Sequence, residues 1–449
     1  MIIEELRQET TSTTVRVTAT VRWEDSDRPP QDVFYEADRS RGEGFAPDAN
    51  ALLVGCYLPA IRGGERRIRL AGPVCPRLRD GLAVAASLLE HWYRGSRRPI
   101  PIEPEEGFRA PMPRSTARAA FFLTGGIDSM AMLHANRRNF PANHPGAFRE
   151  AIAVFGLTVP GQEESPAARD LQDRTVAALD DALEGTGIGL VPVTTNLSTL
   201  APDIAFLELE FLSAALVSAA YLFPGRWSSV SIASGRDVAN LFPQGTHPIL
   251  DESYGTAATA IRHEGLELFR LDKLRSIASW DRAIENLIVC MNPVPPPWLN
   301  CGVCEKCIRT MTELIAVGRL DDARRFPCRN VTSSMIESLP RDAGFKRAWA
   351  EMLPELRRRG RGDLAGAIER KLAETRRVTR WFDEGGIKGR LRALDRRFLG
   401  GRLLDASRAI RRAAASLRRP ARLGARDARA PETGVEREIT RLPETVGVE

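Results

Sequence analysis

The stretch AAFFLTGGIDS, residues 119–129, indicates the fold class of this 449-residue chain. Residues 119–123 form a short apolar run, which is typical of a buried strand in a parallel sheet. Gly125 and Gly126 then supply a turn, and residues 129–137 continue as a helix. Because glycine has no Cβ, the backbone of such a turn can bend sharply and approach a ligand closely. The stretch therefore predicts a strand, a tight turn and a helix in direct succession.

This turn has the chemistry of a phosphate-binding loop. The first amides of the following helix lack intrahelical partners and lie at the positive end of the helix dipole, which favours phosphate or pyrophosphate. Thr124 and Ser129 add hydroxyl groups. Asp128 would repel a bare phosphate, so we expect a bridging Mg²⁺ held by oxygen ligands. The sequence has no Walker-type loop, so hydrolysis at a γ-phosphate is not indicated. The plain alternative is a Gly-Gly turn without a ligand.

Further strands and helices alternate after this turn. Strands are predicted at 151–155, 188–193 and 230–233, and helices at 167–183 and 207–222. This order predicts a parallel sheet with helices on both faces. Gly235 and Arg236 follow the fourth strand at the carboxyl edge, where ligands of open α/β sheets bind. They are therefore candidate nucleotide-binding residues, with an ordinary strand-to-loop turn as the alternative.

Thr124–Ser129 resembles the Ser-Gly-Gly-x-Asp-Ser signature of the PP-loop ATP pyrophosphatases, with threonine in place of the first serine. That family includes asparagine, GMP and NAD synthetases, tRNA-thiolation enzymes and 7-cyano-7-deazaguanine synthases. The resemblance implies a HUP-like (adenine nucleotide alpha hydrolase-like) fold that binds ATP and Mg²⁺, with Asp128 and Ser129 in the catalytic machinery. The nucleotide-binding residues that it implies are Thr124, Gly125, Gly126, Ile127, Asp128 and Ser129, together with Val154, Phe155 and Gly156 as the adenine-binding segment.

Four cysteines follow the spacing C-x10-C-x2-C-x2-C: Cys290, Cys301, Cys304 and Cys307. Four thiolates at such spacings can surround one Zn²⁺ tetrahedrally and leave no open position for catalysis. An iron–sulfur cluster and ordinary buried thiols are the alternatives. With Gly302 and Arg309, the group resembles the zinc knuckle of the deazaguanine synthases, although its first spacing is longer. The remaining cysteines, Cys56, Cys75 and Cys328, are isolated and are predicted to be core thiols.

Two further groups are candidates for chemistry. His247 and Asp251 lie in a polar loop after the fourth strand, where we expect His247 to orient the substrate and Asp251 to bind an amine or a second metal. Lys273 and Arg275 precede the cysteines and could neutralise a departing pyrophosphate. The alternatives are an exposed turn for the first group and a solvated helix face for the second.

The chain divides into four predicted regions: an N-terminal α+β domain (1–110), a PP-loop domain (117–263), a helical region with the cysteines (264–375) and a basic tail (388–449). Residues 387–430 hold 14 Lys or Arg against 3 Asp, an excess larger than the whole chain's net charge of +6. The remainder is therefore net acidic. The tail is either a basic amphipathic helix that contacts an anionic surface or a solvated extension.

Composition and the absence of long apolar runs indicate the class and location of the protein. With 43% hydrophobic and 27% charged residues, the chain is in the globular range. It has no apolar run of about 20 residues, so no transmembrane segment is predicted. The first residues lack the regions of a secretory signal, so we expect a reducing, cytoplasmic location.

Together these features predict an ATP-dependent ligase. It would adenylate a carboxylate or amide of a small molecule or a protein, release pyrophosphate, and join the product to a nitrogen nucleophile. No cysteine follows Met1, so we do not expect a built-in class II glutaminase, and the nitrogen would arrive free or from a partner protein. Two alternatives stay open: a tRNA-modifying PP-loop enzyme, which the acidic body does not favour, and a nucleotide-binding regulatory module without turnover.

Overall fold

The computed structural model describes residues 1–93, 98–110, 118–340 and 347–379. The predicted basic tail lies outside these residues. The described chain forms two compact units, 1–302 with 310–330, and 303–309 with 331–379.

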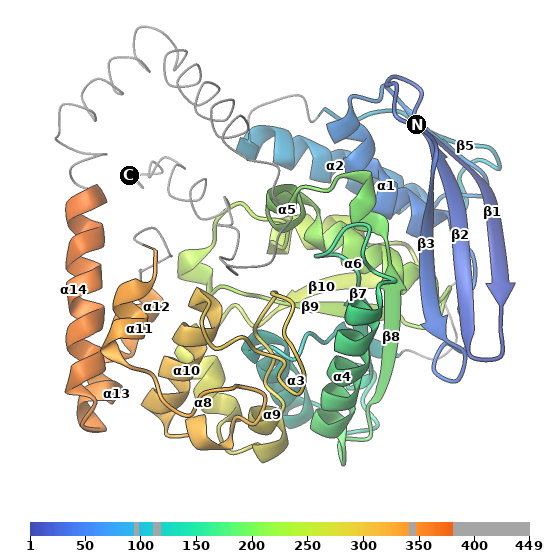
Figure 1. The fold of residues 1–449 in the computed structure, drawn as a ribbon. Helices are drawn as coiled ribbons and strands as arrows, with labels where there is room; N and C mark the ends of the chain where they lie inside the picture. Colours follow the sequence, from blue (N-terminus) through green and yellow to red (C-terminus); the bar gives the residue numbers. More distant parts are fainter. Residues whose placement is uncertain (94–97, 111–117, 341–346, 380–449) are drawn as a thin grey trace, which may run out of the picture. The chain divides into compact units, whose positions relative to one another are not determined.

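The first unit is built on one ten-stranded sheet (Figure 1). Its strands lie in the order β10 (Ala260–Glu264), β9 (Ser229–Ala233), β6 (Ala119–Phe122), β7 (Phe148–Phe155), β8 (Gly189–Thr195), β3 (Gln31–Asp38), β2 (Thr14–Arg22), β1 (Ile2–Thr10), β4 (Ile68–Leu70) and β5 (Ile102–Pro104). The five strands from β10 to β8 are parallel, as are β1, β4 and β5. The pairs β8–β3, β3–β2 and β2–β1 are antiparallel. The prediction of a mostly parallel α/β sheet is confirmed.

The sheet continues across the boundary that the sequence predicts near residue 110. Strand β3 pairs with β8 through Tyr35 and Thr195, and Thr195 Oγ1 donates a hydrogen bond of 2.7 Å to the Phe34 carbonyl. One hydrophobic cluster includes Val17 of β2, Phe122 of β6 and Val193 of β8. The N-terminal strands therefore extend the central sheet and share its core, although the sequence predicts a separate unit.

Helices cover both faces of this sheet. They are α1 (Ala49–Gly63), α2 (Pro76–Tyr93), α3 (Ile127–Asn139), α4 (Pro166–Leu183), α5 (Ile204–Phe206), α6 (Leu212–Tyr221), α7 (Pro248–Asp251), α8 (Arg270–Ile277) and α9 (Asp281–Glu285), while α10 (Glu305–Val317) contributes residues to both units. Phe122 and Ile232 join the core cluster with α1 and α6, whereas Phe121 and Ser231 point to the other face because strand side chains alternate. Helix α3 packs on that second face, against β7 and β9.

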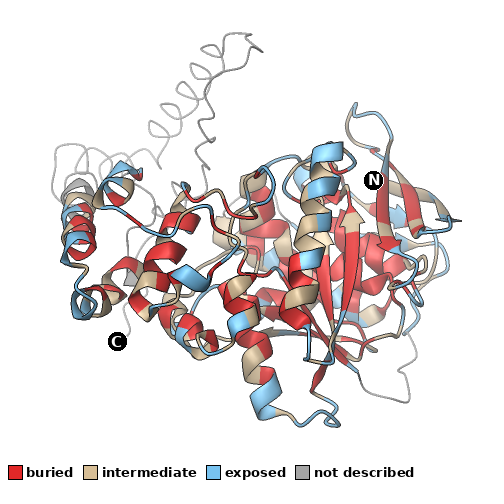
Figure 2. Cartoon of the chain, turned by 60° about the horizontal axis from the view of Figure 1, so that its bottom comes forward, coloured by how far each residue is buried: buried red, intermediate tan, exposed pale blue. Residues whose placement is uncertain are grey.

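One helical stretch among the described residues, Ile204–Tyr221, has the length and hydropathy of a membrane span. It contains a π-helical turn at Leu207–Phe211. Within the fold, 72% of the stretch is buried and its α6 part packs on α1. Figure 2 shows the buried residues of the chain in red. This burial is that of a core helix.

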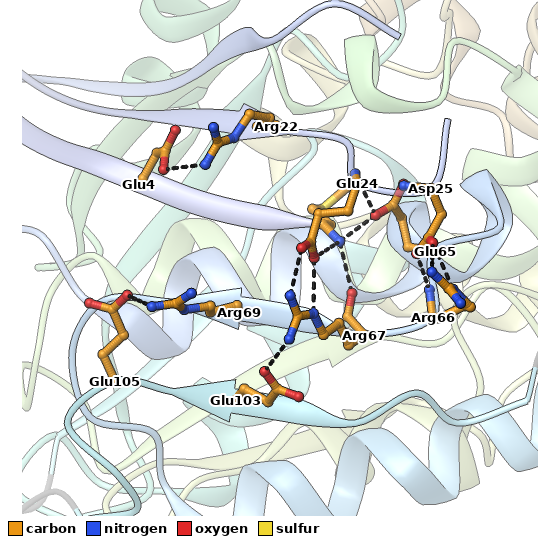
Figure 3. A network of polar contacts seen from close by, with 11 residues as sticks. Glu4, Arg22, Glu24, Asp25, Glu65, Arg66, Arg67, Arg69, Glu103 and Glu105 are labelled. Carbon is orange, nitrogen blue, oxygen red and sulfur yellow. Dashed lines mark hydrogen bonds and ion pairs between the residues drawn. The ribbon is translucent and has the colours of Figure 1, made fainter. Parts of the chain in front are cut away.

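A polar network fixes the start of the chain to the sheet (Figure 3). The α-ammonium of Met1 pairs with Glu65, and the side chains of both residues are fully buried. The ammonium also donates to Glu24 at 3.2 Å and to the Arg67 carbonyl at 2.9 Å. Glu65 accepts two further backbone N–H groups, those of Glu24 and Asp25, at 3.0 and 3.1 Å. The buried carboxylate is thus both paired and hydrogen-bonded, which a buried charge requires.

The second unit is helical. It contains α11 (Ser333–Ser338), α12 (Arg347–Glu351), α13 (Leu353–Arg358) and α14 (Gly362–Thr379), with the first three packed on α14. Lys371 of α14 donates to the Leu339 carbonyl at 2.7 Å, and Trp349 is fully buried with its indole N–H 3.2 Å from Glu305.

Candidate functional site

The glycine turn has the backbone form that its sequence predicts. Strand β6 ends at Phe122, Gly125 lies in the left-handed region with φ +76°, and Gly126 begins α3 without a side-chain cap hydrogen bond. Left-handed backbone is costly for residues with a Cβ. A Cβ on Gly125 would also lie 3.1 Å from Ile288 and from Leu179. The uncapped start of α3 leaves backbone N–H donors directed at the turn.

Hydroxyl groups hold the turn in shape. The hydroxyls of Thr124 and Ser129 lie 3.2 Å apart, and Ser129 Oγ donates to the Gly126 carbonyl at 3.1 Å. The amides of Thr124 and Gly126 donate to these hydroxyls at 3.3 Å each. Ser129 is 2% exposed. Both predicted hydroxyl residues therefore organise the turn, with Ser129 almost wholly internal.

Two cations of α8 converge on Asp128 at the start of α3. Lys273 Nζ lies 3.2 Å from Asp128 Oδ1, and Arg270 Nη1 lies 3.3 Å from Oδ2. Lys273 is 3% exposed and also donates to the Ser234 carbonyl, at 2.5 Å, at the end of β9. Arg270 is held by Glu313, whose two oxygens lie 3.2 Å from its Nε. Two cationic side chains are thus fixed at the mouth of the glycine turn, where the carboxylates of Asp128 and Glu313 balance their charge.

Lys273 is one of the residues that the sequence predicts near the phosphates, whereas Arg270 is not. Residues three apart share one face of a helix, so Arg270 and Lys273 point the same way. The same periodicity places Arg275 on another face, where it pairs with Asp272 at 2.7 Å and is 44% exposed. The three-residue spacing of Arg270 and Lys273 on a helix could have indicated that both side chains reach the same site.

The predicted adenine segment lies at the same edge of the sheet. Val154 and Phe155 end β7, the parallel neighbour of β6, and both are half-buried. Gly156 has φ +90°, and a Cβ there would lie 2.0 Å from the Thr195 carbonyl. The glycine is therefore required for the close approach of this segment to β8. Its carbonyl accepts a hydrogen bond from Ser198 at 3.1 Å.

Gly235 and Arg236 are exposed in the turn after β9. Ser234 closes this turn by accepting from the Arg236 amide at 3.2 Å and donating to its carbonyl at 2.6 Å. The Arg236 guanidinium stacks over Phe242 with its carbon 4.6 Å from the ring centroid.

His247 and Asp251 pack into the protein instead of lining a cavity. Asp251 is fully buried and accepts hydrogen bonds from Ser213 Oγ at 2.6 Å and from the His247 amide at 2.9 Å. Its other oxygen lies 2.7 Å from Nδ1 of His263. No oxygen of Asp251 is exposed to a substrate or a metal, because the loop folds onto α6 and β10. Asp251 therefore binds other side chains of the protein, and the expected contact of Asp251 with an amine or a second metal is not seen.

His247 caps α7, where its Nδ1 accepts from the Ile249 amide at 3.3 Å, and its ring packs edge-on against Trp92 with centroids 4.9 Å apart. Burial lowers the pKa of His247, an effect that outweighs the nearby carboxylate of Asp251. The imidazole is accordingly neutral near pH 7, as its capping role requires.

The four cysteines come together as their spacing predicts. The sulfur atoms of Cys290, Cys301, Cys304 and Cys307 all lie within 4.8 Å of one another. A tetrahedral site with Zn–S bonds of about 2.3 Å needs sulfur separations of about 3.8 Å, so the group could bind a metal such as zinc. Gly302 has φ +73° in the tight turn between two of these ligands.

A buried asparagine organises the approach to this group. Asn300 is fully buried, and its Oδ1 accepts the amides of Val289 at 2.8 Å and Cys290 at 3.2 Å. Its Nδ2 donates to the Leu287 carbonyl at 2.9 Å. Sequence reasoning missed Asn300, since a single asparagine next to Cys301 carries no periodic signal.

A pocket of about 290 Å³ adjoins the charged start of α3. Residues along α3 form one wall, and residues 264–268, from the last residue of β10 onward, form the other. The lining residues are Asp128, Ala131, Met132, Ala135, Asn136, Asn139, Phe140, His263, Glu264, Gly265, Leu266, Glu267, Leu268 and Lys273. Asp128 of the glycine turn and Lys273, which pairs with it, therefore also line the cavity.

Comparison with known proteins finds no match to a family model, a curated protein or a solved structure. The molecule itself defines a mixed α/β protein with a large, mostly parallel sheet and a group of four cysteines able to bind a metal.

Proposed function

We propose that this chain is an ATP-dependent ligase that adenylates a carboxylate or amide substrate and joins it to a nitrogen nucleophile. The observation that carries the proposal is the convergence of Lys273 and Arg270 on Asp128 at the uncapped start of α3. Free helix amides, a glycine turn and two fixed cations form a site for a polyphosphate. The residues that would hold ATP are those of the turn, 124–129, with the adenine near Val154–Gly156.

The same residues support cleavage between the α- and β-phosphates. An oxygen of the substrate would attack the α-phosphorus, the bond from that phosphorus to the bridging oxygen would break, and pyrophosphate would leave with the electron pair. Lys273 and Arg270 would stabilise this departing charge, because fixed cations in a desolvated site act without reorganisation. Asp128 is 24% exposed, and a carboxylate beside phosphate oxygens is a donor set that suits Mg²⁺, which would supply further charge neutralisation.

The second half-reaction would form the carbon–nitrogen bond. The nitrogen attacks the activated carbon, the bond from that carbon to the AMP oxygen breaks, and the nitrogen loses a proton to solvent. In this proposal the four cysteines hold zinc in a structural role, since four protein ligands leave no open position. The metal would fix the position of Cys290, which Asn300 also holds, and so would stabilise the neighbouring Ile288, whose N–H binds the Gly125 carbonyl of the turn.

The test is to incubate the protein with Mg-ATP, a panel of carboxylic acids and an amine, and to follow AMP and pyrophosphate. Equal amounts of AMP and pyrophosphate that depend on the acid would support the proposal. Asp128→Asn should lower the rate about 100-fold, whereas the exposed control Asp321→Asn should not. ADP and orthophosphate as the products would overturn it. Nucleotide binding without AMP across the panel would instead support a regulatory module.

A further inference from the structure

The pocket beside α3 carries more negative charge than its surroundings neutralise. Among its lining side chains are three carboxylates, Asp128, Glu264 and Glu267, against the single ammonium of Lys273. Asp128 is already paired with Lys273 and Arg270. Within the described parts of the chain, neither Glu264 nor Glu267 has a cationic partner. Two uncompensated carboxylates therefore face one cavity.

Glu264 is held in position. Its Oε1 accepts a hydrogen bond of 2.6 Å from Ser231, which is 1% exposed on β9. Ser231 belongs to the face of the sheet on which α3 packs, so this bond directs the carboxylate toward the pocket side. A neutral donor satisfies one oxygen and leaves the negative charge in place.

Besides these charged groups, the lining has three neutral polar or imidazole side chains, Asn136, Asn139 and His263, and a set of apolar ones. Ala131, Met132 and Ala135 line the α3 wall, and Leu266 and Leu268 line the opposite one. A hydrated Mg²⁺ prefers an octahedral oxygen shell and keeps several waters, which such walls do not accommodate well. An anionic ligand would meet repulsion from the carboxylates. An organic cation with a short hydrocarbon chain matches both properties of the cavity.

We infer that this pocket binds a primary alkylamine, with its ammonium at Glu264 and Glu267 and its chain between α3 and residues 264–268. If the proposed function holds, on which this step rests, the nitrogen nucleophile of the ligase is an amine of this class. The pocket meets the glycine turn at Asp128 and Lys273, so an amine held there lies next to the position where the adenylate would form.

A matched pair of probes tests the binding step without ATP. Pentylamine and pentanoate share a chain length and differ in the sign of their charge. We expect pentylamine to bind to the full chain in ligand-observed NMR and calorimetry, and pentanoate not to bind. Glu267→Gln and Glu264→Gln should each weaken pentylamine about tenfold, because each removes a charge-assisted contact. Glu106→Gln, an exposed acid outside the pocket, is the control and should leave the affinity unchanged.

A second variant separates charge from space. Ala135→Phe fills the pocket from α3 without changing its charge and should abolish pentylamine binding, while circular dichroism checks that the fold is intact. Equal binding of both probes, or pentylamine affinity unaffected by all three pocket variants, would overturn the inference. So would binding of Mg²⁺ alone in the pocket with no binding of pentylamine.

The two proposals fail separately. If pentylamine binds as described but no acid yields AMP, the pocket assignment holds and the ligase assignment falls. If AMP and pyrophosphate form but pentylamine neither binds nor accelerates AMP release, the ligase stands and the amine pocket is wrong.

Discussion

Ile288 donates its backbone N–H to the carbonyl oxygen of Gly125 at 2.9 Å. This bond joins the glycine turn to the segment that reaches the first cysteine two residues later. The Ile288 side chain also occupies the space that a Cβ on Gly125 would need. The candidate phosphate loop and the candidate metal group are therefore joined directly through Ile288.

Loss of the metal should weaken nucleotide binding. Cys301→Ser removes one of the four thiolates, so we expect metal content to fall from about one ion per chain toward zero, with lower melting temperature and weaker ATP binding. Metal analysis would measure the metal content, and calorimetry would measure the melting temperature and ATP binding. Cys328→Ser is the matched control, because Cys328 lies outside the four-sulfur group. Full metal content in Cys301→Ser would contradict the assignment of this residue as a ligand.

Gly125→Ala should disable the turn. Left-handed backbone costs a residue with a Cβ about 1–2 kcal/mol, and the methyl group would also press on Ile288 and Leu179. Gly185→Ala supplies the control, because Gly185 has φ +74° but no atom within 4 Å of a new Cβ. Both variants should lose stability from backbone strain, Gly125→Ala the more because of its added contacts, as denaturant unfolding would measure, and Gly125→Ala alone should lose ATP binding. Intact ATP affinity in Gly125→Ala would count against the turn as the nucleotide site.

The two basic residues predicted near pyrophosphate should behave differently. Lys273→Met removes a buried cation from Asp128 and should lower the rate of pyrophosphate release about 100- to 1000-fold at saturating ATP. Arg275→Ala removes an exposed pair with Asp272 and should change the rate by less than about twofold. Similar losses in both variants would argue that α8 acts only as a structural helix.

Stability should fall in acid through Glu150 on β7. Burial by itself would raise the pKa of Glu150, but hydrogen bonds from Arg226 and Trp227 outweigh it and hold the pKa below the ordinary value of 4.5. The unfolded chain therefore binds a proton first as the pH falls. The contribution of Glu150 is complete above about pH 5 and is lost as the pH drops through the folded-state pKa.

Glu150→Gln isolates this effect. It should lower the free energy of unfolding by about 2 kcal/mol at pH 7, and the difference from the unmodified chain should shrink as the pH falls below 4.5. Urea titrations at several pH values would measure it. A difference that stays constant across this range would contradict the depressed pKa.

Local features were predictable from the sequence, and contacts between distant segments were not. The strand, turn and helix around Gly125 and the grouping of the C-x2-C-x2-C cysteines arise within short stretches of chain, so spacing alone indicates them. The pairing of β3 with β8 joins residues about 160 positions apart, as in Tyr35 and Thr195, and no periodicity encodes such a partner. Asp251 failed as a predicted ligand for the same reason, since its partners Ser213 and His263 come from other elements.

The antiparallel seam between β3 and β8 decides where this protein can be divided. A fragment beginning at residue 118 would keep every residue of the candidate site, yet it would leave β8 with a row of open backbone donors and acceptors. It would also remove the residues of α1 and α2 from the hydrophobic cluster to which Phe122 and Val193 belong. Such a fragment should recruit other strands and aggregate. The N-terminal hundred residues are thus needed to keep the candidate site, which lies after residue 118, in soluble form.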